Sequence, residues 1–411
     1  MVSRLSPIVV TGLGAISALG PDVASLWRGL CAGQRGFRRI RGFDAGGCRV
    51  QLGGEAPQPR LPDSGRWLGL RRAHRTAAFA LDAAAQALAQ SGLSGSALGR
   101  TGLVLGTTGC SDDVLKGFLE RVRRPGYERS SVRSLKDYAK RGLVDSVAQA
   151  LGVGGTRSVV NTACSSGLVA IVLAADWLRV GGCDAVIAGG SDHLTLHTLA
   201  GFCSLRAVDS EPCRPFDRRR RGMTLGEGAG ILVLERLEDA RARGAKPLGV
   251  LAGAGMTADA QHLTAPDALG LGAARAARAA LNEAGIGPEQ IGFINAHGTA
   301  TPHNDRAEVV GMRTILGARS LVCPLSTVKG HIGHCLGAAG AIEAVVTLLS
   351  LRYGWVPPTA GLEEPEFEGM LDFVRRVPRR VSASYALSNS FGFGGNNASV
   401  VFAHPEGLGA P

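Results

Sequence analysis

Short apolar runs alternate along the first half of the chain with longer segments whose apolar residues recur at helical spacing. Runs rich in Val, Ile, Leu and Gly predict strands at 8–12, 101–106, 157–160 and 185–190, and a glycine-rich approach predicts a further buried strand within 226–235. Helical spacing over 74–91 and a small-residue segment at 165–180 predict two helices. Alternating strands and helices indicate a parallel sheet covered by helices.

The second half repeats this pattern from about residue 247. We expect strands at 248–252, 291–295 and 321–325, and helices at 271–284, 303–316 and 335–351. Segments 158–180 and 321–351 have the same order of predicted elements: a strand, a short polar turn and a helix that begins with small residues. The economical interpretation is an internal duplication, with one half at 1–246 and the other at 247–411.

Composition narrows the class of protein. The 411 residues are 45% hydrophobic but only 5% aromatic, and 59 are glycine, so we expect a large core with close backbone packing. The nine cysteines form no CxxC pair, which disfavours a disulfide framework or structural zinc and favours a reducing cytoplasm. The N-terminus has no signal-type pattern and no uninterrupted apolar run reaches about 18 residues, so we expect a cytoplasmic protein without a membrane span.

The net charge of +11 suggests that the protein binds a negatively charged partner. Basic residues are dense at 218–221 and 71–75, but they are not interleaved with aromatic residues as in nucleic-acid-binding surfaces. We therefore expect no nucleic acid partner. Part of the excess reflects an arginine-rich composition, and the remainder is suited to steering an acidic protein or an anionic substrate.

Cys164 is the strongest candidate for catalysis. It lies in a turn between a β-branched run and a small-residue helix. A thiol at the first turn of a helix faces free backbone N–H groups and the positive end of the helix dipole, so we expect a thiolate with a lowered pKa. The same amides could hold an oxyanion beside the sulfur. The alternative is that Cys164 is a small buried hydrophobic residue.

Two histidine-bearing turns, around His297 and around His334, each follow a predicted strand. The carboxyl ends of strands in an α/β sheet collect functional groups at one edge, so both imidazoles could meet Cys164. Lys329 could hold the histidine geometry through a carboxylate such as Glu343. A zinc site at His331 and His334 is the alternative, but no further ligand stands at metalloenzyme spacing, so we expect no metal.

The run from 389 to 397 carries Phe391 and Phe393 between glycines. It could be an ordinary glycine-rich hairpin. Beside an active site, two such phenylalanines would also make a mobile apolar gate.

Together these motifs resemble the β-ketoacyl-acyl-carrier-protein synthases of the elongating Cys-His-His type. The resemblance rests on Thr162–Ser166, His297–Pro302, Lys329–Gly340 and Asn389–Gly395, and it covers essentially the whole chain in the expected order. It implies the thiolase-like α/β fold, in which two pseudo-repeated βαβαβ halves form a five-layered αβαβα arrangement, and a dimer.

The resemblance also assigns roles to residues. Cys164 would carry the acyl chain as a thioester, while His297 and His334 would promote decarboxylation of the malonyl thioester and stabilise the enolate, in a division of labour left open. Lys329 and Glu343 would form a supporting ion pair. The expected reaction is a decarboxylative Claisen condensation with malonyl-acyl carrier protein, giving 3-oxoacyl-acyl carrier protein in fatty-acid or type II polyketide or polyene biosynthesis.

Further roles concern access to the site. The backbone amides of Cys164 and Phe393 would form the oxyanion hole, and Phe391 with Phe393 would gate chain entry. Thr299 and Thr301 would bind the phosphopantetheine arm, which arrives on the acyl carrier protein, so the enzyme itself needs no cofactor.

A basic rim in this family receives the acidic carrier protein, and Arg71, Arg75 and Arg206 fall at matching positions. The partners implied are therefore an acyl carrier protein and a second subunit, either a like chain or a chain-length-factor-like chain.

The chain departs from the family pattern in places that affect the substrate. Asn396 stands where the family usually has Thr, and Met223–Thr224 replaces a more usual Phe-Val pair. The sequence of residues 128–150 also differs from that of typical fatty-acid elongation enzymes. Gly109 aligns with the wall of the acyl pocket, where it would leave room for a longer or bulkier chain.

Two other functions share this fold. Non-catalytic chain-length factors usually lack the cysteine, which this chain keeps together with both histidines and the lysine. Thiolases act on CoA esters with a second active-site cysteine, for which Cys335 is the candidate, but the surrounding motifs favour the decarboxylative enzymes.

Overall fold

A computed structural model describes residues 6–61, 75–109, 117–120, 122–123 and 141–408. Within these residues, eleven strands form one sheet in the order β12-β10-β9-β14-β15-β8-β1-β7-β6-β4-β5. The strands of the first half are β1 (Ile8–Ile16), β4 (Thr101–Gly106), β5 (Arg157–Val160), β6 (Ala185–Asp192) and β7 (Gly228–Arg236). Those of the second half are β8 (Gly249–Ala258), β9 (Ile291–Asn295), β10 (Pro324–Ser326), β12 (Asp372–Phe373), β14 (Tyr385–Gly392) and β15 (Asn396–Ala403).

The two halves of the sheet have the same topology. In chain order, the main strands of each half lie side by side as third, second, fourth, fifth and first, which are β5-β4-β6-β7-β1 and β10-β9-β14-β15-β8. In both halves the first three of these strands are parallel and the last two pair antiparallel. β1 and β8 join the halves, with Ile8 opposite Leu251. The repeat is therefore confirmed in topology, while the boundary between 246 and 247 stays a prediction.

The expected parallel sheet is in fact mixed, because β7 and β15 run antiparallel to their neighbours. β14 turns back into β15 through a tight connection between Gly392 and Asn396. Such a short turn can join only antiparallel strands. The alternation of strands and helices in the sequence does not reveal this reversal of direction.

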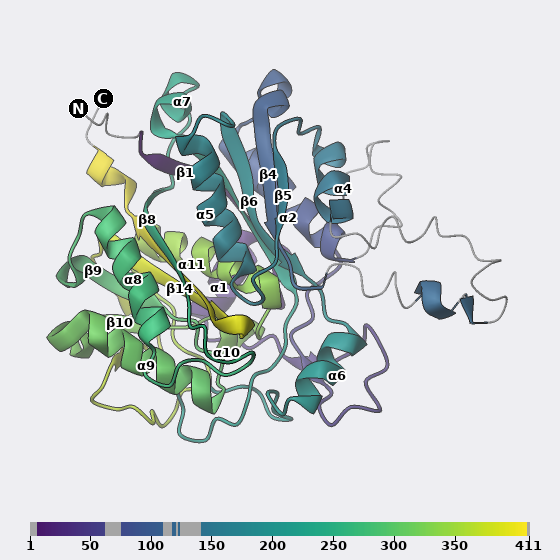
Figure 1. The fold of residues 1–411 in the computed structure, drawn as a ribbon, viewed down its shortest axis with the longest axis vertical. Helices are drawn as coiled ribbons and strands as arrows, with labels where there is room; N and C mark the ends of the chain where they lie inside the picture. Colours follow the sequence, from purple (N-terminus) through teal and green to yellow (C-terminus); the bar gives the residue numbers. More distant parts are fainter. Residues whose placement is uncertain (1–5, 62–74, 110–116, 121, 124–140, 409–411) are drawn as a thin grey trace.

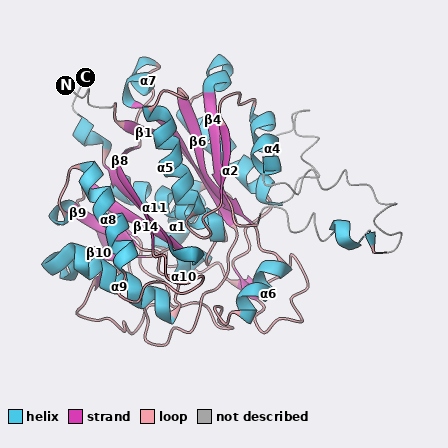
Figure 2. Cartoon of the chain, in the orientation of Figure 1, coloured by secondary structure: helices cyan, strands magenta, loops and turns pink. Residues whose placement is uncertain are grey.

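The two halves of the sheet form two layers, and helices lie between them and on both outer faces, which makes five layers in all (Figures 1 and 2). α5 (Ser166–Arg179) and α11 (Ala339–Tyr353) pack together in the middle and share the central core. The outer face of the first half is covered by α2 (Arg75–Ser91) and α4 (Arg141–Leu151), and that of the second half by α8 (Leu271–Ala284) and α9 (Pro302–Leu316). The predicted αβαβα thiolase-like arrangement is confirmed.

Further α-helices and two short strand pairs lie outside the main sheet. They are α1 (Val23–Cys31), α6 (Leu196–Ser204), α7 (Leu237–Ala242), α10 (Lys329–Ile332), and the strand pairs β2 (Arg38–Arg39) with β3 (Leu52–Gly53) and β11 (Trp355–Val356) with β13 (Arg379–Arg380).

One helical stretch in the described chain, Leu336–Tyr353, is long and apolar enough to cross a membrane. However, 89% of it is buried inside the protein. Its composition therefore reflects burial in the central layer, where every side of α11 meets other elements.

Glycines let the two central helices approach closely. A Cβ on Gly167 in α5 would lie 2.6 Å from the backbone oxygen of Gly337, and one on Gly190 in β6 would lie 2.4 Å from the same oxygen. No side chain fits at either distance. This contact brings the segment after Cys164 against the segment after His334, so the glycine-rich composition directly serves the site.

Candidate active site

The turn that carries Cys164 is strained and tightly bonded. Ala163 adopts a left-handed φ of 52°, which is costly for a residue with a side chain. The Ser166 hydroxyl accepts from the Thr162 N–H at 2.9 Å, and the Ser165 hydroxyl donates to the Thr162 carbonyl at 2.8 Å. These bonds hold the backbone while β5 ends and α5 begins, and they fix Cys164 at the bottom of a cavity.

The expectation of a lowered thiol pKa is wrong for the free enzyme. Burial raises the pKa of Cys164 to about 12, against the opposing charge of Lys329 and a hydrogen bond from the Phe393 N–H. Only 6% of Cys164 is exposed, and desolvation of a thiolate there outweighs the favourable helix terminus. The resting nucleophile is a neutral thiol, and a base must take its proton as the acyl group arrives.

This protonation state predicts how Cys164 reacts with a simple electrophile. The rate of its alkylation by iodoacetamide should rise about tenfold per pH unit between about pH 7 and 9, because only the thiolate reacts and its fraction is still small. The rate is followed by mass spectrometry of the peptide that contains Cys164, with Cys164→Ala as the background. A plateau near neutral pH would contradict the raised pKa.

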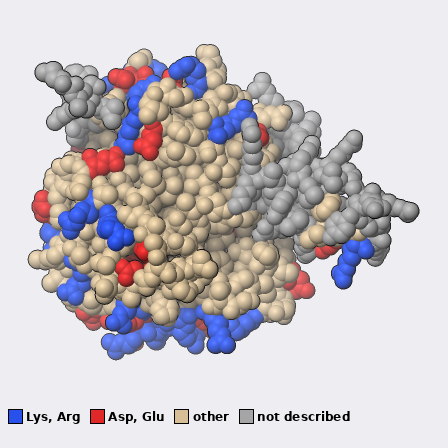
Figure 3. Space-filling view, in the orientation of Figure 1, with Lys and Arg blue, Asp and Glu red and all other residues tan. Residues whose placement is uncertain are grey.

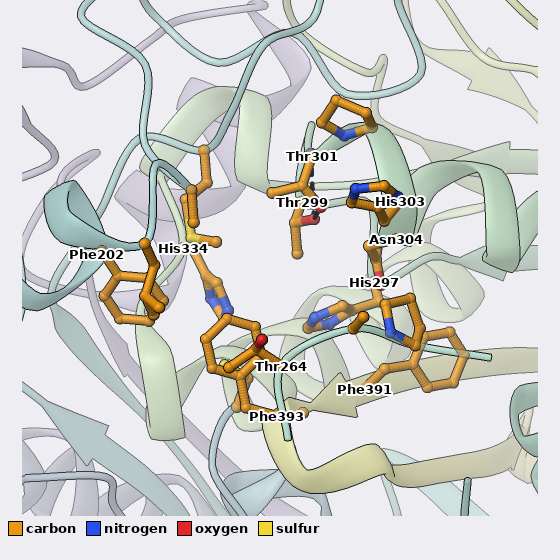
Figure 4. A pocket seen from close by; sticks show the side chains of 18 of the residues that line it. Phe202, Thr264, His297, Thr299, Thr301, His303, Asn304, His334, Phe391 and Phe393 are labelled. Atoms are coloured by element: carbon orange, nitrogen blue, oxygen red, sulfur yellow. Dashed lines mark hydrogen bonds between the residues drawn. The ribbon is translucent and has the colours of Figure 1, made fainter. Parts of the chain in front are cut away.

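Cys164, His297 and His334 line one cavity of about 460 Å³. The two imidazole rings lie with their centroids 5.4 Å apart at an interplanar angle of 87°. Figure 4 shows both rings directed toward the open centre of the cavity, with Phe391 and Phe393 on one side and Thr299 and Thr301 on another. The three distant motifs therefore meet, as the sequence indicated.

Lys329 determines which nitrogen of His297 carries the proton. Its ammonium lies 3.2 Å from His297 Nδ1 and 2.5 Å from the His297 carbonyl oxygen, and it pairs with Glu343. An ammonium has donors only, so Nδ1 must accept and Nε2 must hold the ring proton. Burial first, then the charge of Lys329 and the neighbouring His334, hold the pKa of His297 well below its usual value. His297 is thus a neutral hydrogen-bond donor at the cavity.

Among the described residues, His334 is hydrogen-bonded through its backbone, whose N–H donates to the Thr224 carbonyl at 2.8 Å and whose carbonyl accepts from the Gly226 N–H at 3.0 Å. Neither ring nitrogen has a hydrogen-bond partner within the described residues, although the side chain is buried. Burial and the Lys329 charge hold the pKa of His334 well below its usual value. A neutral imidazole with both nitrogens available can accept one proton and donate another, which His297 cannot do.

Two buried carboxylates support the histidines. Glu343 pairs with Lys329, and burial raises the pKa of Glu343 against that charge. Glu308 accepts from the N–H groups of His297 and Gly298, each at 2.8 Å, and burial raises its pKa to about 7. Glu308 was missed from the sequence. Its only signal is an acidic residue between the apolar Ala307 and Val309 on a helix.

The residues expected at the cavity mouth lie there. The Thr299 and Thr301 hydroxyls are 2.9 Å apart and both line the cavity. Phe391 packs on His297 with ring centroids 5.6 Å apart, and Phe393 packs on Phe202 at 5.7 Å. Asn396, the departure from the family pattern, donates its side-chain amide to the Phe393 carbonyl at 2.9 Å.

The expected docking arginines do not lie together. Arg206 is exposed at the cavity mouth, where Arg221 also lies. Arg75 instead pairs with Glu227 at 2.6 Å, donates to the Ala56 carbonyl at 2.7 Å and does not line this cavity. Its guanidinium is engaged inside the fold, so we leave it out of the docking surface. Arg71 lies outside the described residues.

In the view of Figure 3, Lys and Arg side chains gather along the lower edge of the molecule. Basic side chains are therefore concentrated along one edge of the face seen in this view. Such clustering raises the local attraction for an acidic partner.

Three other residues singled out from the sequence lie outside the cavity lining. Gly109 follows β4 and does not line the cavity, so its acyl-pocket role stays a prediction. His331 places its ring nitrogens 2.6 Å from the Gln34 carbonyl and 2.7 Å from the Pro358 carbonyl, which keeps it from sharing a metal with His334. Cys335 is buried outside the cavity lining, with its sulfur 3.6 Å from the Glu227 carbonyl.

Comparison with known proteins agrees with this geometry. The model of the beta-ketoacyl synthase N-terminal domain matches residues 5–240, and that of the C-terminal domain matches 248–363. The 3-oxoacyl-[acyl-carrier-protein] synthase 2 of Vibrio cholerae is 38% identical over 96% of this chain and 98% of its own.

Two solved structures are also similar along their whole length. The ishigamide ketosynthase/chain length factor has a TM-score of 0.90 and 33% identity over 98% of this chain and 100% of its own. A ketosynthase bound to the hexaketide, in complex with its type II polyketide synthase acyl-carrier protein, has a TM-score of 0.88 and 28% identity over the same shares. Cys164 and both histidines line one cavity, and the buried Lys329 contacts His297. On this geometry and these similarities, the chain belongs to the beta-ketoacyl synthase family, the acyltransferases that carry out ketoacyl synthase condensation in fatty-acid or type II polyketide biosynthesis.

Proposed function

We propose that this enzyme holds an acyl chain on Cys164 and condenses it with malonyl-acyl carrier protein, releasing carbon dioxide and 3-oxoacyl-acyl carrier protein. The observation that carries this proposal is the shared cavity of Cys164, His297 and His334, with the Phe393 N–H directed at the sulfur. These are the groups that an acyl transfer and an enolate both require.

In the first half-reaction, Cys164 attacks the carbonyl of an acyl thioester. His334 is the group suited to accept the thiol proton, because both of its ring nitrogens lack partners in the described chain. The N–H of Phe393 already lies against the sulfur, and the Cys164 N–H stands beside it as the second expected donor to the oxyanion. The carrier thiol leaves with a proton, and the acyl group stays on Cys164.

In the second half-reaction, the malonyl carbon–carbon bond breaks and carbon dioxide departs. The electron pair moves onto the thioester carbonyl, where His297 Nε2–H is suited to donate, because Lys329 holds its tautomer. The enolate carbon then attacks the acyl carbonyl on Cys164, and the sulfur leaves and regains its proton. This assigns a fixed donor role to His297 and a proton-transfer role to His334.

The partner that delivers both thioesters would be an acyl carrier protein. Thr299 and Thr301 line the mouth, where their hydroxyls can bind the pantetheine arm, and Arg206 and Arg221 flank the same opening. Both arginines are exposed, but Arg221 pairs with Asp209 at 3.2 Å, so Arg206 is the better suited of the two to contact an acidic partner. The solved ketosynthase complex with an acyl-carrier protein supports this arrangement.

Reversing one rim charge tests the docking surface. Arg206→Glu should raise the KM for malonyl-acyl carrier protein about tenfold and weaken its dependence on salt, with little change in kcat. Steady-state kinetics at low and moderate salt measure this. Arg380→Glu, at another exposed arginine that does not line the cavity, is the matched control. Equal KM values for the two variants would refute docking at Arg206.

We also propose that the enzyme is a cytoplasmic dimer, of two like chains or of this chain with a chain-length-factor-like partner. The similar ketosynthase/chain length factor supports the second form. Because this chain keeps the catalytic cysteine, it would be the catalytic subunit. Mass measurement of the purified protein, alone and co-expressed with a neighbouring homologue, distinguishes the two forms.

The reaction itself is tested with purified enzyme, acyl-acyl carrier protein and malonyl-acyl carrier protein. Mass spectrometry should detect the acyl group on the peptide that contains Cys164, and then a 3-oxoacyl product with two more carbons after malonyl addition. An acyl group that never reaches Cys164 in an active enzyme would overturn the assignment. Comparison of acyl chains of different length and unsaturation identifies the substrate class.

A further inference from the structure

The imidazole of His334 has to be positioned through its backbone, because neither ring nitrogen has a hydrogen-bond partner in the described chain. At His334 itself the backbone is held by the Thr224 carbonyl and the Gly226 N–H. Figure 4 shows the ring directed toward the open centre of the cavity. The segment that follows His334 matters equally, since any shift of this backbone moves the ring relative to Cys164.

That segment is tied to a buried carboxylate. Asp192 is the last residue of β6 and is 1% exposed. Its Oδ2 accepts from the Gly337 N–H at 2.7 Å, shortly after His334 in the chain. Between these two residues, Leu336 has a left-handed φ of 52°, a costly conformation that persists only where the surrounding contacts hold it. The hydrogen bond from Gly337 to Asp192 is one of those contacts.

The same carboxylate holds the end of β4, which lies beside β6 in the sheet (Figure 1). Its Oδ1 accepts from the Thr107 hydroxyl at 2.6 Å, and its Oδ2 accepts from the N–H and the hydroxyl of Thr108 at 2.9 and 2.8 Å. The Thr107 N–H in turn donates to the Val160 carbonyl at 3.1 Å, at the end of β5 and just before the turn that carries Cys164. Asp192 therefore connects the turn of the nucleophile with the turn of the unpartnered histidine.

We propose that Asp192 is a positioning residue that holds the ring of His334 in place relative to Cys164. Asp192 does not line the cavity, so it acts through the backbone of Gly337 and not by touching the substrate. Burial raises the pKa of Asp192, and the hydrogen bonds from its donors oppose that shift. The effect on rate rests on the proposed function, because it requires that His334 take part in the reaction.

Two substitutions at Asp192 separate its acceptor oxygens from its charge. Asp192→Ala leaves the Gly337 N–H without this partner, so kcat should fall about tenfold to a hundredfold while the KM for malonyl-acyl carrier protein stays within about twofold. Asp192→Asn keeps one acceptor oxygen for Gly337, and its NH2 group can donate to the Thr107 hydroxyl. It should therefore retain at least about half of the wild-type kcat. Steady-state kinetics of the purified full-length enzyme measure both.

Gly337→Ala disturbs the same contact from the other side, and it decides the test if Asp192→Ala does not fold. A Cβ on Gly337 would lie 2.7 Å from the Thr107 Cα and 2.8 Å from Asp192 Oδ2. The two segments must then move apart, so kcat should fall here as well. Asp82→Ala is the matched control and should keep its kcat. Asp82 is also a buried carboxylate that accepts a backbone N–H, from Arg60 at 2.7 Å, but it lies on the outer helix α2.

NMR of enzyme labelled with ¹³C in its histidine rings reports the position of the His334 ring without any need for activity. The His334 signal is identified by its loss in His334→Ala. We expect Asp192→Ala and Gly337→Ala to move this signal and Asp192→Asn to leave it near its wild-type position. The His331 signal, identified in the same way, is the internal reference, because that ring is hydrogen-bonded to two backbone carbonyls.

An unmoved His334 signal in Asp192→Ala, or in Gly337→Ala if the former does not fold, would overturn the proposal whatever the rate. Equal losses of kcat in Asp192→Asn and Asp192→Ala would overturn it too, since the charge rather than the acceptor would then matter. A moved signal with an unchanged kcat would support the anchor at Asp192 but contradict the proton-transfer role of His334. The failure of this proposal and that of the proposed function are therefore distinguishable.

Discussion

Replacing Lys329 with methionine should destabilise the enzyme by about 3–5 kcal/mol and abolish condensation. Lys329 is 1% exposed and Glu343 is fully buried, so the substitution leaves a carboxylate without its partner in the core. Burial already raises the pKa of Glu343, and removing Lys329 takes away the charge that opposes this shift. The loss is measured by urea denaturation.

The pH dependence of the Lys329→Met variant tests this cause. A carboxyl group with a raised pKa in the folded state binds protons more readily there than in the unfolded chain, so its folded state gains stability as pH falls. The stability deficit relative to wild type should therefore be larger near pH 8 than near pH 5.5. An equal deficit at both values would mean that lost packing, rather than an uncompensated Glu343 charge, explains the effect.

A double variant separates stability from catalysis. Lys329→Met with Glu343→Gln removes both charges and should recover much of the lost stability, since no buried carboxylate remains unpaired. It should not recover condensation, because His297 Nδ1 still lacks the donor that fixes its tautomer. Recovery of activity together with stability would show that Lys329 serves only the fold.

Local patterns predicted the elements well where burial alone determines them. The expected strand at 291–295 and helix at 271–284 have the bounds observed for β9 and α8. The helix expected at 335–351 begins later, at Ala339, because Leu336 has a left-handed φ of 52° and opens a short 3-10 turn. The direction of β7 and β15 depends on which neighbours they pair with, and hydrophobic periodicity carries no information about that.

For the site, too, local motifs were predictable and long-range contacts were not. Cys164, His297, His334 and Lys329 stand in short motifs, so the sequence located them. The ion pair of Arg75 could not be foreseen, because its partner Glu227 lies 152 residues away and an ion pair of that separation leaves no local pattern. The thiol pKa was misjudged for a related reason. The helix terminus is visible in the sequence, but the burial that outweighs it arises only when both halves pack together.

Replacing Cys164 with alanine should reduce the rate of condensation at least about a thousandfold, because the acyl group can then no longer form a thioester with the enzyme. Decarboxylation of malonyl-acyl carrier protein should persist. His297, His334 and Lys329 keep their contacts in the variant, since none of the hydrogen bonds that hold His297 involves the Cys164 side chain. Release of labelled carbon dioxide and formation of 3-oxoacyl product are measured side by side.

Cys335→Ala is the matched control, since Cys335 is also buried but does not line the cavity. It should retain both activities, apart from a modest loss of stability from the removed sulfur. If it instead lost condensation while keeping its fold, a second catalytic cysteine would be needed and the thiolase alternative would return. If Cys164→Ala lost decarboxylation together with condensation, the histidines would depend on the sulfur, and the separate roles proposed for His297 and His334 would be wrong.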